Sequence, residues 1–193
     1  MQIILATTSK YRIEKFSQLK IPFISEASNV DEKFPDRPQN PVRLVATLAK
    51  MKAAAVARNH EKGLVIGMDT VGYFKGHILE KPKSRDVAFN RLKILSNTTH
   101  YSFAGVHMLH IATGKFITKV ARTKITFRKL TDSEINKYLD QDPDYEQFCL
   151  GYDPEKFYSS SFVKCISGSY MGYIAGIPLE IIAAYLPKFG YIL

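Results

Sequence analysis

"LVIGMDTVGYFKGHILEKP", residues 64–82, joins a mostly apolar run to a tight reversal of the chain. Its first part, 64–69, is predicted to form a buried strand, and 71–80 is predicted to form a hairpin. Asp69 ends the buried strand, and Lys81 follows the return strand of the hairpin. Packing of a core does not require a carboxylate and an ammonium at these places, so both residues are candidates for a function.

Strand-like and helix-like patterns alternate on both sides of this stretch. Apolar or alternating runs predict further strands at 3–6, 22–28, 100–112, 115–130 and 162–167. Helical spacing and capping residues predict helices at 10–19, 42–60, 84–96 and 131–141, and a last helix after 176–178. The mixture predicts an α/β or α+β fold built on a mixed sheet, with a long antiparallel ribbon and an irregular segment at 142–160.

The size and composition indicate one ordinary globular domain. The chain has 193 residues, of which 46% are hydrophobic, and this is enough to build a core. It contains no apolar run long enough to span a membrane, and its start lacks the pattern of a signal peptide. We therefore expect a cytoplasmic protein without a membrane partner, in which Cys149 and Cys165 are reduced thiols.

The net charge of +9 favours anionic partners, either nucleic acid or phosphorylated metabolites. The 27 lysines and arginines are scattered and form no block of five or more, which weakens the case for nucleic acid. A generally basic surface without a specific partner is a third interpretation of the same charge. Charge alone therefore does not identify the partner.

Asp69 and Lys52 each have two interpretations. Asp69 could cap a turn with its carboxylate, or it could contact a ligand, because ligands of α/β sheets bind beyond the carboxyl ends of strands. Lys52 falls within the apolar stripe of the helix predicted at 42–60, whereas Lys50 points the other way and is expected to be solvated. A lysine in such a stripe either extends its ammonium to the surface or contacts an anion held over the core. The stripe consists of Val45, Leu48, Ala49, Ala53 and Val56.

Arg12 and Glu32 are also ambiguous when each is considered alone. Arg12 lies in the first turn of a helix that begins after Ser9, where the helix dipole disfavours a cation. A phosphate at that N-terminus, held by the guanidinium, would explain the arginine, and an exposed side chain is the simpler alternative. Glu32 lies with Asp31 in a loop that is expected to be solvated unless its carboxylates bind something.

Taken together, these residues fit phosphoryl chemistry. The two carboxylates of Glu32 and Asp69 could hold a hard divalent ion such as Mg²⁺ through oxygen ligands. Arg12, Lys52 and Lys81 could neutralise a polyphosphate, and a water activated by the metal or by a carboxylate could attack phosphorus. The chain contains no Walker A motif, no nucleophile elbow and no clustered histidines of the HExxH type, so the enzyme classes that use these motifs are excluded.

The same residues lie in motifs that resemble those of the Maf proteins, nucleoside triphosphate pyrophosphatases related in fold to inosine triphosphatases. "LATTSKYRIEKF", "NVDEKF" and "LAKMKA" are similar to the family's "LASxSPRRxELL", acidic loop motif and "LAxxKA". "VIGMDTVGYFKGHILEKP" resembles "VIGADTxVxxxGxxLxKP", and "ISGSYMGYIAGIPL" resembles "IxGSYxxVxGLPL". The motifs occur in the family's order over residues 3–179.

The resemblance implies an activity and a set of roles. The enzyme would hydrolyse a nucleoside triphosphate between the α and β phosphates, releasing monophosphate and pyrophosphate, with Mg²⁺ or Mn²⁺ as cofactor. Asp69 and Glu32 would be the catalytic and metal-binding residues, with Asp69 and Lys81 on opposite sides of one reacting phosphate. The substrate-binding residues would be Ser9, Arg12, Lys52, Thr70 and Lys81.

The family also implies a fold and an assembly. Residues 1–193 would form a single domain, an elongated two-lobed α/β body on a long mixed sheet with a cleft between the lobes. The protein would act as a homodimer on a nucleotide, without a stable nucleic-acid complex.

The chain departs from the family pattern in two places. Lys10 and Tyr11 replace the proline and the first arginine of "SPRR", so one arginine on the phosphate side is missing. The glutamine of the family's "AGAYxIQG" segment has no evident counterpart in residues 148–161, and one extra residue precedes Gly176. Pyrimidine, methylated guanine and other modified bases therefore all remain open as the substrate's base.

Two alternatives to the enzyme follow from these observations. A catalytically impaired homologue that only binds nucleotides, acting in division control, would explain the altered segment. A basic nucleic-acid-binding protein would explain the net charge of +9. The presence of both Glu32 and Asp69 favours the enzyme, because a binding module needs the cations but not both carboxylates.

Overall fold

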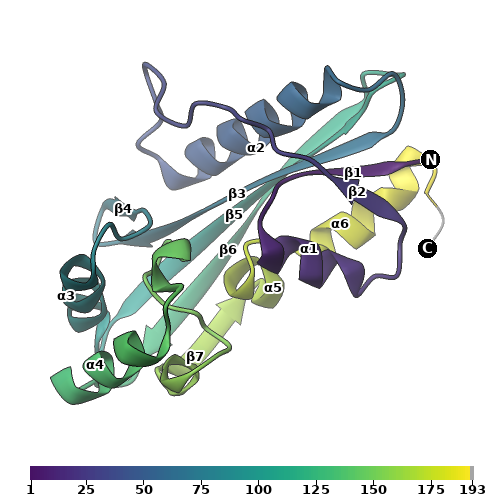
Figure 1. Ribbon diagram of the computed structural model, residues 1–193. Coiled ribbons are helices and arrows are strands. Elements are labelled where there is room, and N and C mark those ends of the chain that lie inside the picture. The colour runs from purple at the N-terminus through teal and green to yellow at the C-terminus, as the bar shows by residue number, and fades with distance from the viewer. Residues whose placement is uncertain (192–193) are drawn as a thin grey trace. The chain divides into compact units, whose positions relative to one another are not determined.

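The computed structural model describes residues 1–191 and has a mixed α/β fold (Figure 1). Its strands are β1 (Ile3–Ala6), β2 (Phe23–Ser25), β3 (Leu64–Phe74), β4 (His77–Leu79), β5 (Thr99–His110), β6 (Phe116–Phe127) and β7 (Val163–Gly168). Its α-helices are α1 (Lys10–Ser17), α2 (Pro41–Ala57), α3 (Arg85–Leu95), α4 (Asp132–Gln141), α5 (Tyr170–Ile174) and α6 (Leu179–Tyr185). Short 3₁₀ helices span Tyr145–Gln147, Tyr158–Ser161 and Leu186–Phe189.

The strands form one mixed sheet. Within the described residues the sheet is seven-stranded with the order β2-β1-β3-β5-β6-β7, and β4 pairs with β3. β1 pairs in parallel with β2 and β3, whereas β3 with β4 and β6 with β7 are antiparallel. The expected mixed α/β fold is therefore confirmed.

The chain divides into two compact units. Unit 1 comprises Met1–Thr70, Phe103–Ala121 and the chain from Met171 onward, and unit 2 comprises Val71–Ser102 and Arg122–Tyr170. The expectation of one two-lobed domain with a cleft stays a prediction.

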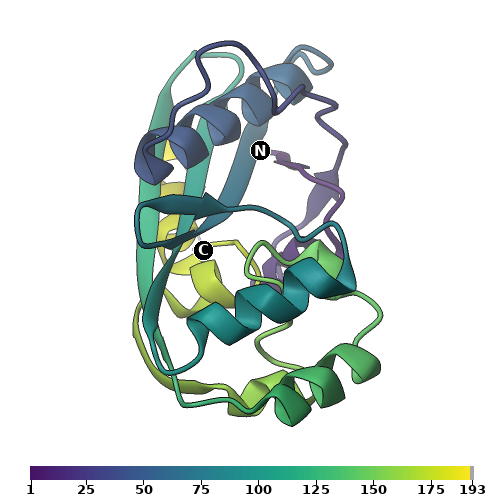
Figure 2. The ribbon, with the colours of Figure 1, turned by 90° about the vertical axis from the view of Figure 1, so that its left-hand side faces the viewer.

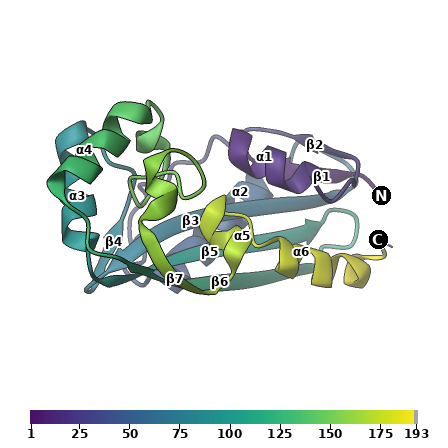
Figure 3. The same ribbon diagram turned by 90° about the horizontal axis from the view of Figure 1, so that it is seen from below.

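Unit 1 has a helical layer on each face of its strands. Side chains alternate along a strand, so neighbouring residues of β1 and β3 face opposite sides. One face packs on α1 and α6 and the other packs on α2. Figure 1 shows α2 on one side of β1 and β3 and α1 with α6 on the other; Figure 3, seen from below, shows α1 and α6 in front with α2 behind. The α1–α6 side buries Ile3, Leu5, Leu64, Ile66 and Met68, and the α2 side buries Ile4, Ala6 and Val65.

Two glycines bring α2 unusually close to the strands. A Cβ on Gly67 of β3 would lie 2.1 Å from the carbonyl oxygen of Ala49, and one on Gly105 of β5 would lie 2.4 Å from that of Val45. Any larger residue at either position would push the helix away. These glycines therefore set the distance of α2 from β3 and β5.

Unit 2 has an aromatic core and a side-by-side pair of helices, α3 and α4 (Figure 2). Phe127 contacts the rings of Tyr152 and Phe162 at centroid distances of 5.1 and 5.9 Å. Tyr138 of α4 packs on Phe162 and donates a hydrogen bond to Asp142. Residues 142–160 are irregular apart from their 3₁₀ turns, as expected, and are organised around these side chains.

Several local predictions are confirmed and others need correction. The hairpin turns at Lys75 and Gly76, and Thr131 with Glu134 forms the expected capping box of α4. The strand expected at 22–28 is shorter, because β1, with which it pairs, has only four residues. A Gly-rich turn was expected where α5 forms, and Pro178 occupies the N-cap position of α6 rather than its first turn.

Candidate functional site

The side chain of Asp69 lies on the α2 face of β3. Asp69 follows Val65 and Gly67 in the alternation of the strand, and the residue is 6% exposed. The prediction that Asp69 ends the buried strand is wrong, because β3 continues through it to Phe74. A buried carboxylate needs partners, because removing an unpaired charge from water is costly. Its partner comes from α2.

Lys52 of α2 bridges two carboxylates. Its Nζ lies 2.7 Å from Oδ1 of Asp69 and 2.7 Å from Oε1 of Glu32. The lysine side chain is 11% exposed, so the alternative in which it extends its ammonium to the surface is wrong. Lys52 follows Ala49 by about one helical turn, and the close approach of Ala49 to Gly67 brings its side chain beside Asp69.

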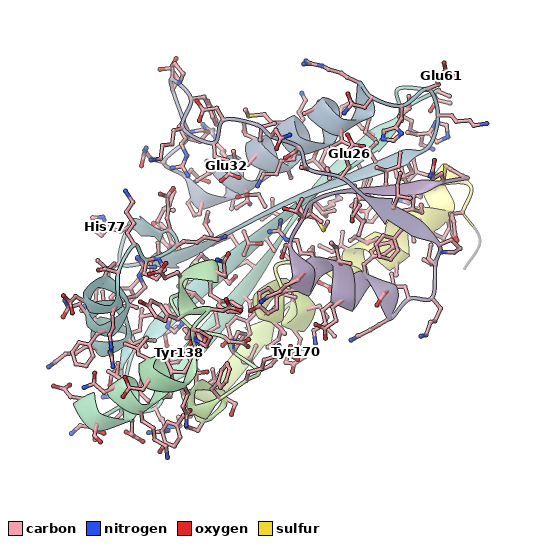
Figure 4. All side chains as sticks on the ribbon, in the orientation of Figure 1. Glu26, Glu32, Glu61, His77, Tyr138 and Tyr170 are labelled. Atoms are coloured by element: carbon pink, nitrogen blue, oxygen red, sulfur yellow. The ribbon has the colours of Figure 1, made fainter. Side chains whose placement is uncertain are left out.

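Glu32 belongs to the loop before α2, beside which Figure 4 labels it. Its side chain is 51% exposed, yet its carboxylate contacts the Lys52 ammonium. The expectation that this loop is simply solvated is therefore wrong for Glu32. Lys50, by contrast, is exposed, as its position on the helix predicted.

Burial dominates the electrostatics of Asp69. Desolvation raises the pKa of Asp69 above its usual value, and the positive charges of Lys52 and Arg12 oppose that rise without cancelling it. An ion pair by itself would lower the pKa of a carboxylate, so the direction shows how strongly this group is buried. A carboxylate with a raised pKa is a better acceptor for a proton.

Arg12 is not an exposed arginine. It is half-buried, and its guanidinium donates to the carbonyl oxygens of Gly176 and Met68 at 3.1 and 2.9 Å. A third hydrogen bond, of 3.2 Å, goes to Oγ1 of Thr70. The alternative of a solvated side chain is therefore wrong, and the expected contact of Arg12 with a phosphate stays a prediction. The sequence pattern could not identify the carbonyl groups of Gly176 and Met68 as partners of Arg12.

The contacts of Ser9 and Lys81 do not test the roles predicted for them. Ser9 occupies the N-cap position of α1, but its side chain makes no capping hydrogen bond. Lys81 is exposed, belongs to unit 2, and donates to Oε1 of Gln147 at 3.4 Å. The prediction that Lys81 and Asp69 lie on opposite sides of a phosphate stays a prediction. The substrate roles of Ser9 and Lys81 also stay predictions. Sequence reasoning did not single out Gln147.

The histidines and thiols form no site. His100 and His107 belong to β5, where they are buried, and burial lowers the pKa of each to about 4. Cys149 and Cys165 are thiols, as expected. Among residues 1–191 no three His, Cys, Asp or Glu side chains are grouped so as to hold a metal ion by themselves.

The donor set of Glu32 and Asp69 nevertheless fits one kind of metal ion. Their carboxylate oxygens both lie within contact distance of one cationic group, the Lys52 ammonium. Two carboxylates with no sulfur or imidazole ligand suit a hard divalent ion, which takes its remaining ligands from water and substrate phosphates. A metal held by these residues would thus keep several water ligands, which substrate phosphates could replace.

Comparison with known proteins assigns the chain to a family. The family model described as Maf-like protein matches residues 2–189. The chain belongs to the Maf family. The resemblance noted in the sequence motifs is therefore confirmed over almost its whole length.

Curated Maf relatives have two different substrate names. A protein of Pelotomaculum thermopropionicum named dTTP/UTP pyrophosphatase is 34% identical, with 98% of this chain and 97% of that protein covered. One of Nitrosococcus oceani named 7-methyl-GTP pyrophosphatase is 31% identical, with 98% and 94% covered. Among solved structures, the Ham1 protein of Staphylococcus aureus matches with a TM-score of 0.54 at 18% identity, covering 98% of this chain and 100% of that one. That last likeness concerns the fold alone. No helix within residues 1–191 is long and apolar enough to cross a membrane.

Proposed function

We propose that this Maf protein is a nucleoside triphosphate pyrophosphatase, which hydrolyses the α–β phosphoanhydride to give a nucleoside monophosphate and pyrophosphate. The observation that carries the proposal is the position of the Lys52 ammonium, 2.7 Å from the carboxylates of both Glu32 and Asp69. The names of the curated relatives, pyrophosphatases acting on dTTP and UTP or on 7-methyl-GTP, support the same reaction.

Glu32 and Asp69 would hold the divalent ion, Mg²⁺ or Mn²⁺. The ion would supply charge neutralisation at the reacting phosphate. Its affinity for the protein alone would be low, because two carboxylates leave most of its ligand positions to water and phosphate. The phosphates of the nucleotide would therefore tighten the binding of the ion.

The residues of the chain supply positioning and proton transfer. The oxygen of an attacking water forms a bond to phosphorus while the bond to the bridging oxygen breaks, and Asp69 accepts the proton that the water loses. Lys52 and Lys81 would neutralise the phosphate oxygens, with Ser9 donating a hydrogen bond. The hydroxyl of Thr70 donates to the carbonyl oxygen of Gly176, and its direct contact with the substrate stays a prediction. The guanidinium of Arg12 is engaged by three acceptors, the carbonyl oxygens of Gly176 and Met68 and Oγ1 of Thr70.

The base of the substrate is proposed only as a choice among classes. The relatives named for pyrimidine nucleotides and for 7-methyl-GTP are 34% and 31% identical, a difference too small to favour one of them. The protein would accept dTTP and UTP, 7-methyl-GTP, or another modified nucleotide. A homodimer in the cytoplasm, without a nucleic-acid complex, remains our expectation for its assembly.

The deciding experiment is pyrophosphate release from a panel of canonical and modified nucleoside triphosphates. Each reaction is run with Mg²⁺, with Mn²⁺ and with a chelator. We expect metal-dependent release from one or two of the nucleotides, with monophosphate as the second product. Silence across the panel, with nucleotides still bound, would overturn the enzyme and support the homologue that only binds nucleotides. Release of orthophosphate would contradict the proposed position of cleavage.

A further inference from the structure

Arg12 connects three segments that lie far apart in the sequence. Its Nη1 donates to the carbonyl oxygen of Met68 and its Nη2 to Oγ1 of Thr70, across sequence separations of 56 and 58 residues. Its Nε donates to the carbonyl oxygen of Gly176, across 164 residues. All of these residues belong to unit 1. One guanidinium thus joins α1, the middle of β3 and the turn before α6.

Two of these acceptors belong to the immediate neighbours of Asp69. Met68 precedes it and Thr70 follows it in β3. Because side chains alternate along a strand, Thr70 faces the α1–α6 side while Asp69 faces α2 and Lys52. Arg12 therefore holds the backbone of Asp69 from the face opposite the one on which its carboxylate meets the lysine.

The turn at Gly176 closes this arrangement. Oγ1 of Thr70 donates to the Gly176 carbonyl at 3.3 Å, so Arg12, Thr70 and Gly176 contact one another. Gly176 has a φ of +66°, and a Cβ there would lie 2.5 Å from Oγ1 of Thr70 and 3.2 Å from Nη2 of Arg12. A side chain at Gly176 would be strained by its backbone and would press on this hydrogen-bonded group.

The guanidinium of Arg12 commits three of its five N–H donors to these acceptors, one from each of its nitrogens. Its N–H donors lie in one plane and point in fixed directions, and here Nε, Nη1 and Nη2 are each directed at a different acceptor. Turning the fork toward a phosphate would break the bonds on both sides of Asp69. An arginine used in this way fixes the position of a neighbouring group rather than binding a ligand.

We propose that Arg12 is a positioning residue for Asp69 and not a phosphate ligand. This inference rests on the proposed pyrophosphatase activity. A positioned carboxylate matters in the transition state, where small displacements are costly, and matters little for binding of the nucleotide. Loss of Arg12 should therefore lower kcat and leave KM almost unchanged.

The first test is Arg12→Lys, which keeps the charge but cannot reach three acceptors. We expect kcat to fall about 10- to 100-fold with KM changed by less than about 3-fold. The matched control is Arg58→Lys, an exposed arginine of the same unit just after α2, which should change neither constant. A rise in KM with kcat intact would make Arg12 a phosphate ligand and overturn the inference.

Gly176→Ala provides a second test that removes no phosphate-binding side chain. It should give the same pattern of lowered kcat and unchanged KM, since the added Cβ presses on Thr70 and Arg12. In the double variant with Arg12→Lys, the two losses of kcat should be less than additive, because both act on one hydrogen-bonded group. Fully additive losses would overturn the shared arrangement.

Mn²⁺ binding to the nucleotide-free protein gives a readout that does not depend on turnover. Arg12→Lys should weaken Mn²⁺ binding severalfold, because a less fixed Asp69 is a poorer ligand, and Arg58→Lys should not. Unchanged Mn²⁺ affinity in Arg12→Lys would count against positioning. A wild-type protein that neither turns over nucleotides nor binds Mn²⁺ would overturn the proposed function first, and this inference with it.

Discussion

Asp69 in unit 1 and Asp142 in unit 2 are both buried carboxylates, but their partners differ in kind. Asp69 meets the ammonium of Lys52, 17 residues away in the sequence. Asp142 accepts hydrogen bonds from neutral donors close by, the hydroxyl of Tyr138 at 2.5 Å and the backbone N–H of Asp144 at 2.8 Å. Asp153, also in unit 2, accepts from the backbone N–H groups of Glu155 and Lys156.

The difference is the one expected between a structural carboxylate and a catalytic one, the role proposed for Asp69. Neutral local donors satisfy Asp142 and Asp153 and order the irregular segment that contains them. An ammonium, by contrast, can be displaced from a carboxylate by a competing cation, or can move to a phosphate that is a better partner for it. Perturbed acidity alone does not make the distinction, because burial raises the pKa of both Asp69 and Asp153.

The largest effect is expected from removing the charge of Asp69. Asp69→Asn should lower turnover by about 1,000-fold or more, because the amide neither accepts the proton nor holds the metal. Nucleotide binding should stay close to wild type because the lysines that would contact the phosphates are unchanged. The melting temperature should also stay close, because the substitution is isosteric and the Lys52 ammonium keeps Glu32 as its partner. Steady-state rates, with calorimetry for binding, test this. Near-normal turnover would show that Asp69 has no part in the mechanism and is a structural carboxylate like Asp142.

The sequence predicted those parts of the molecule that depend on local signals. The Lys-Gly hairpin, the capping box of α4 and the apolar stripe of α2 each depend on residues within one turn or one strand. α5 was missed because a five-residue helix after a glycine has almost no periodicity to detect. The mixed sheet followed from the order of such local elements.

The candidate site was only partly predictable, because its contacts depend on tertiary approach. The helical pattern placed Lys52 on the inner face of α2, but its two carboxylate partners depend on how close Gly67 and Gly105 allow the helix to come. The contacts of Arg12 with the carbonyl oxygens of Gly176 and Met68 could not be predicted, because no sequence pattern marks a backbone acceptor.

A second expected effect concerns pH and a buried imidazole of unit 2. His100 is 0% exposed, its pKa is lowered to about 4, and within residues 1–191 neither of its ring nitrogens has a hydrogen-bond partner. The unfolded chain takes up a proton below pH 6.5 and the folded chain does not. Stability should therefore fall as the pH drops from 6.5 toward 4, by about 3 kcal/mol in total for this group.

Urea unfolding across that pH range measures the loss, and His100→Leu is the matched variant. Leucine cannot titrate, so the variant should lose less stability between pH 6.5 and 4 than the wild type. Identical pH profiles for the two proteins would show that His100 does not contribute. The buried imidazole of His100 would then have no effect on the pH dependence of stability.

A third prediction tests the local donors of unit 2. Tyr138→Phe removes the hydroxyl that donates to Asp142 and accepts from the backbone N–H of Asp153, leaving two buried polar groups unpaired. The free energy of unfolding should fall by about 2 kcal/mol. Urea unfolding measures it, and Tyr170→Phe, an exposed tyrosine of the same unit, is the control. An equal effect in both variants would mean that the buried network is not what stabilises this region.

The smallest effect is expected at the ammonium that the metal would displace. Lys52→Met leaves Glu32 and Asp69 without their cation, so Mn²⁺ should bind the nucleotide-free protein about 10-fold more tightly, since one repulsive positive charge has gone. Lys50→Met removes the same charge from an exposed position of α2 and should change Mn²⁺ affinity much less. Calorimetric titration of both variants separates a local exchange of cations from a general effect of net charge. Equal shifts in the two variants would show that Lys52 does not compete with the metal. Asp69 would then be a structural carboxylate, like Asp142 and Asp153 of unit 2.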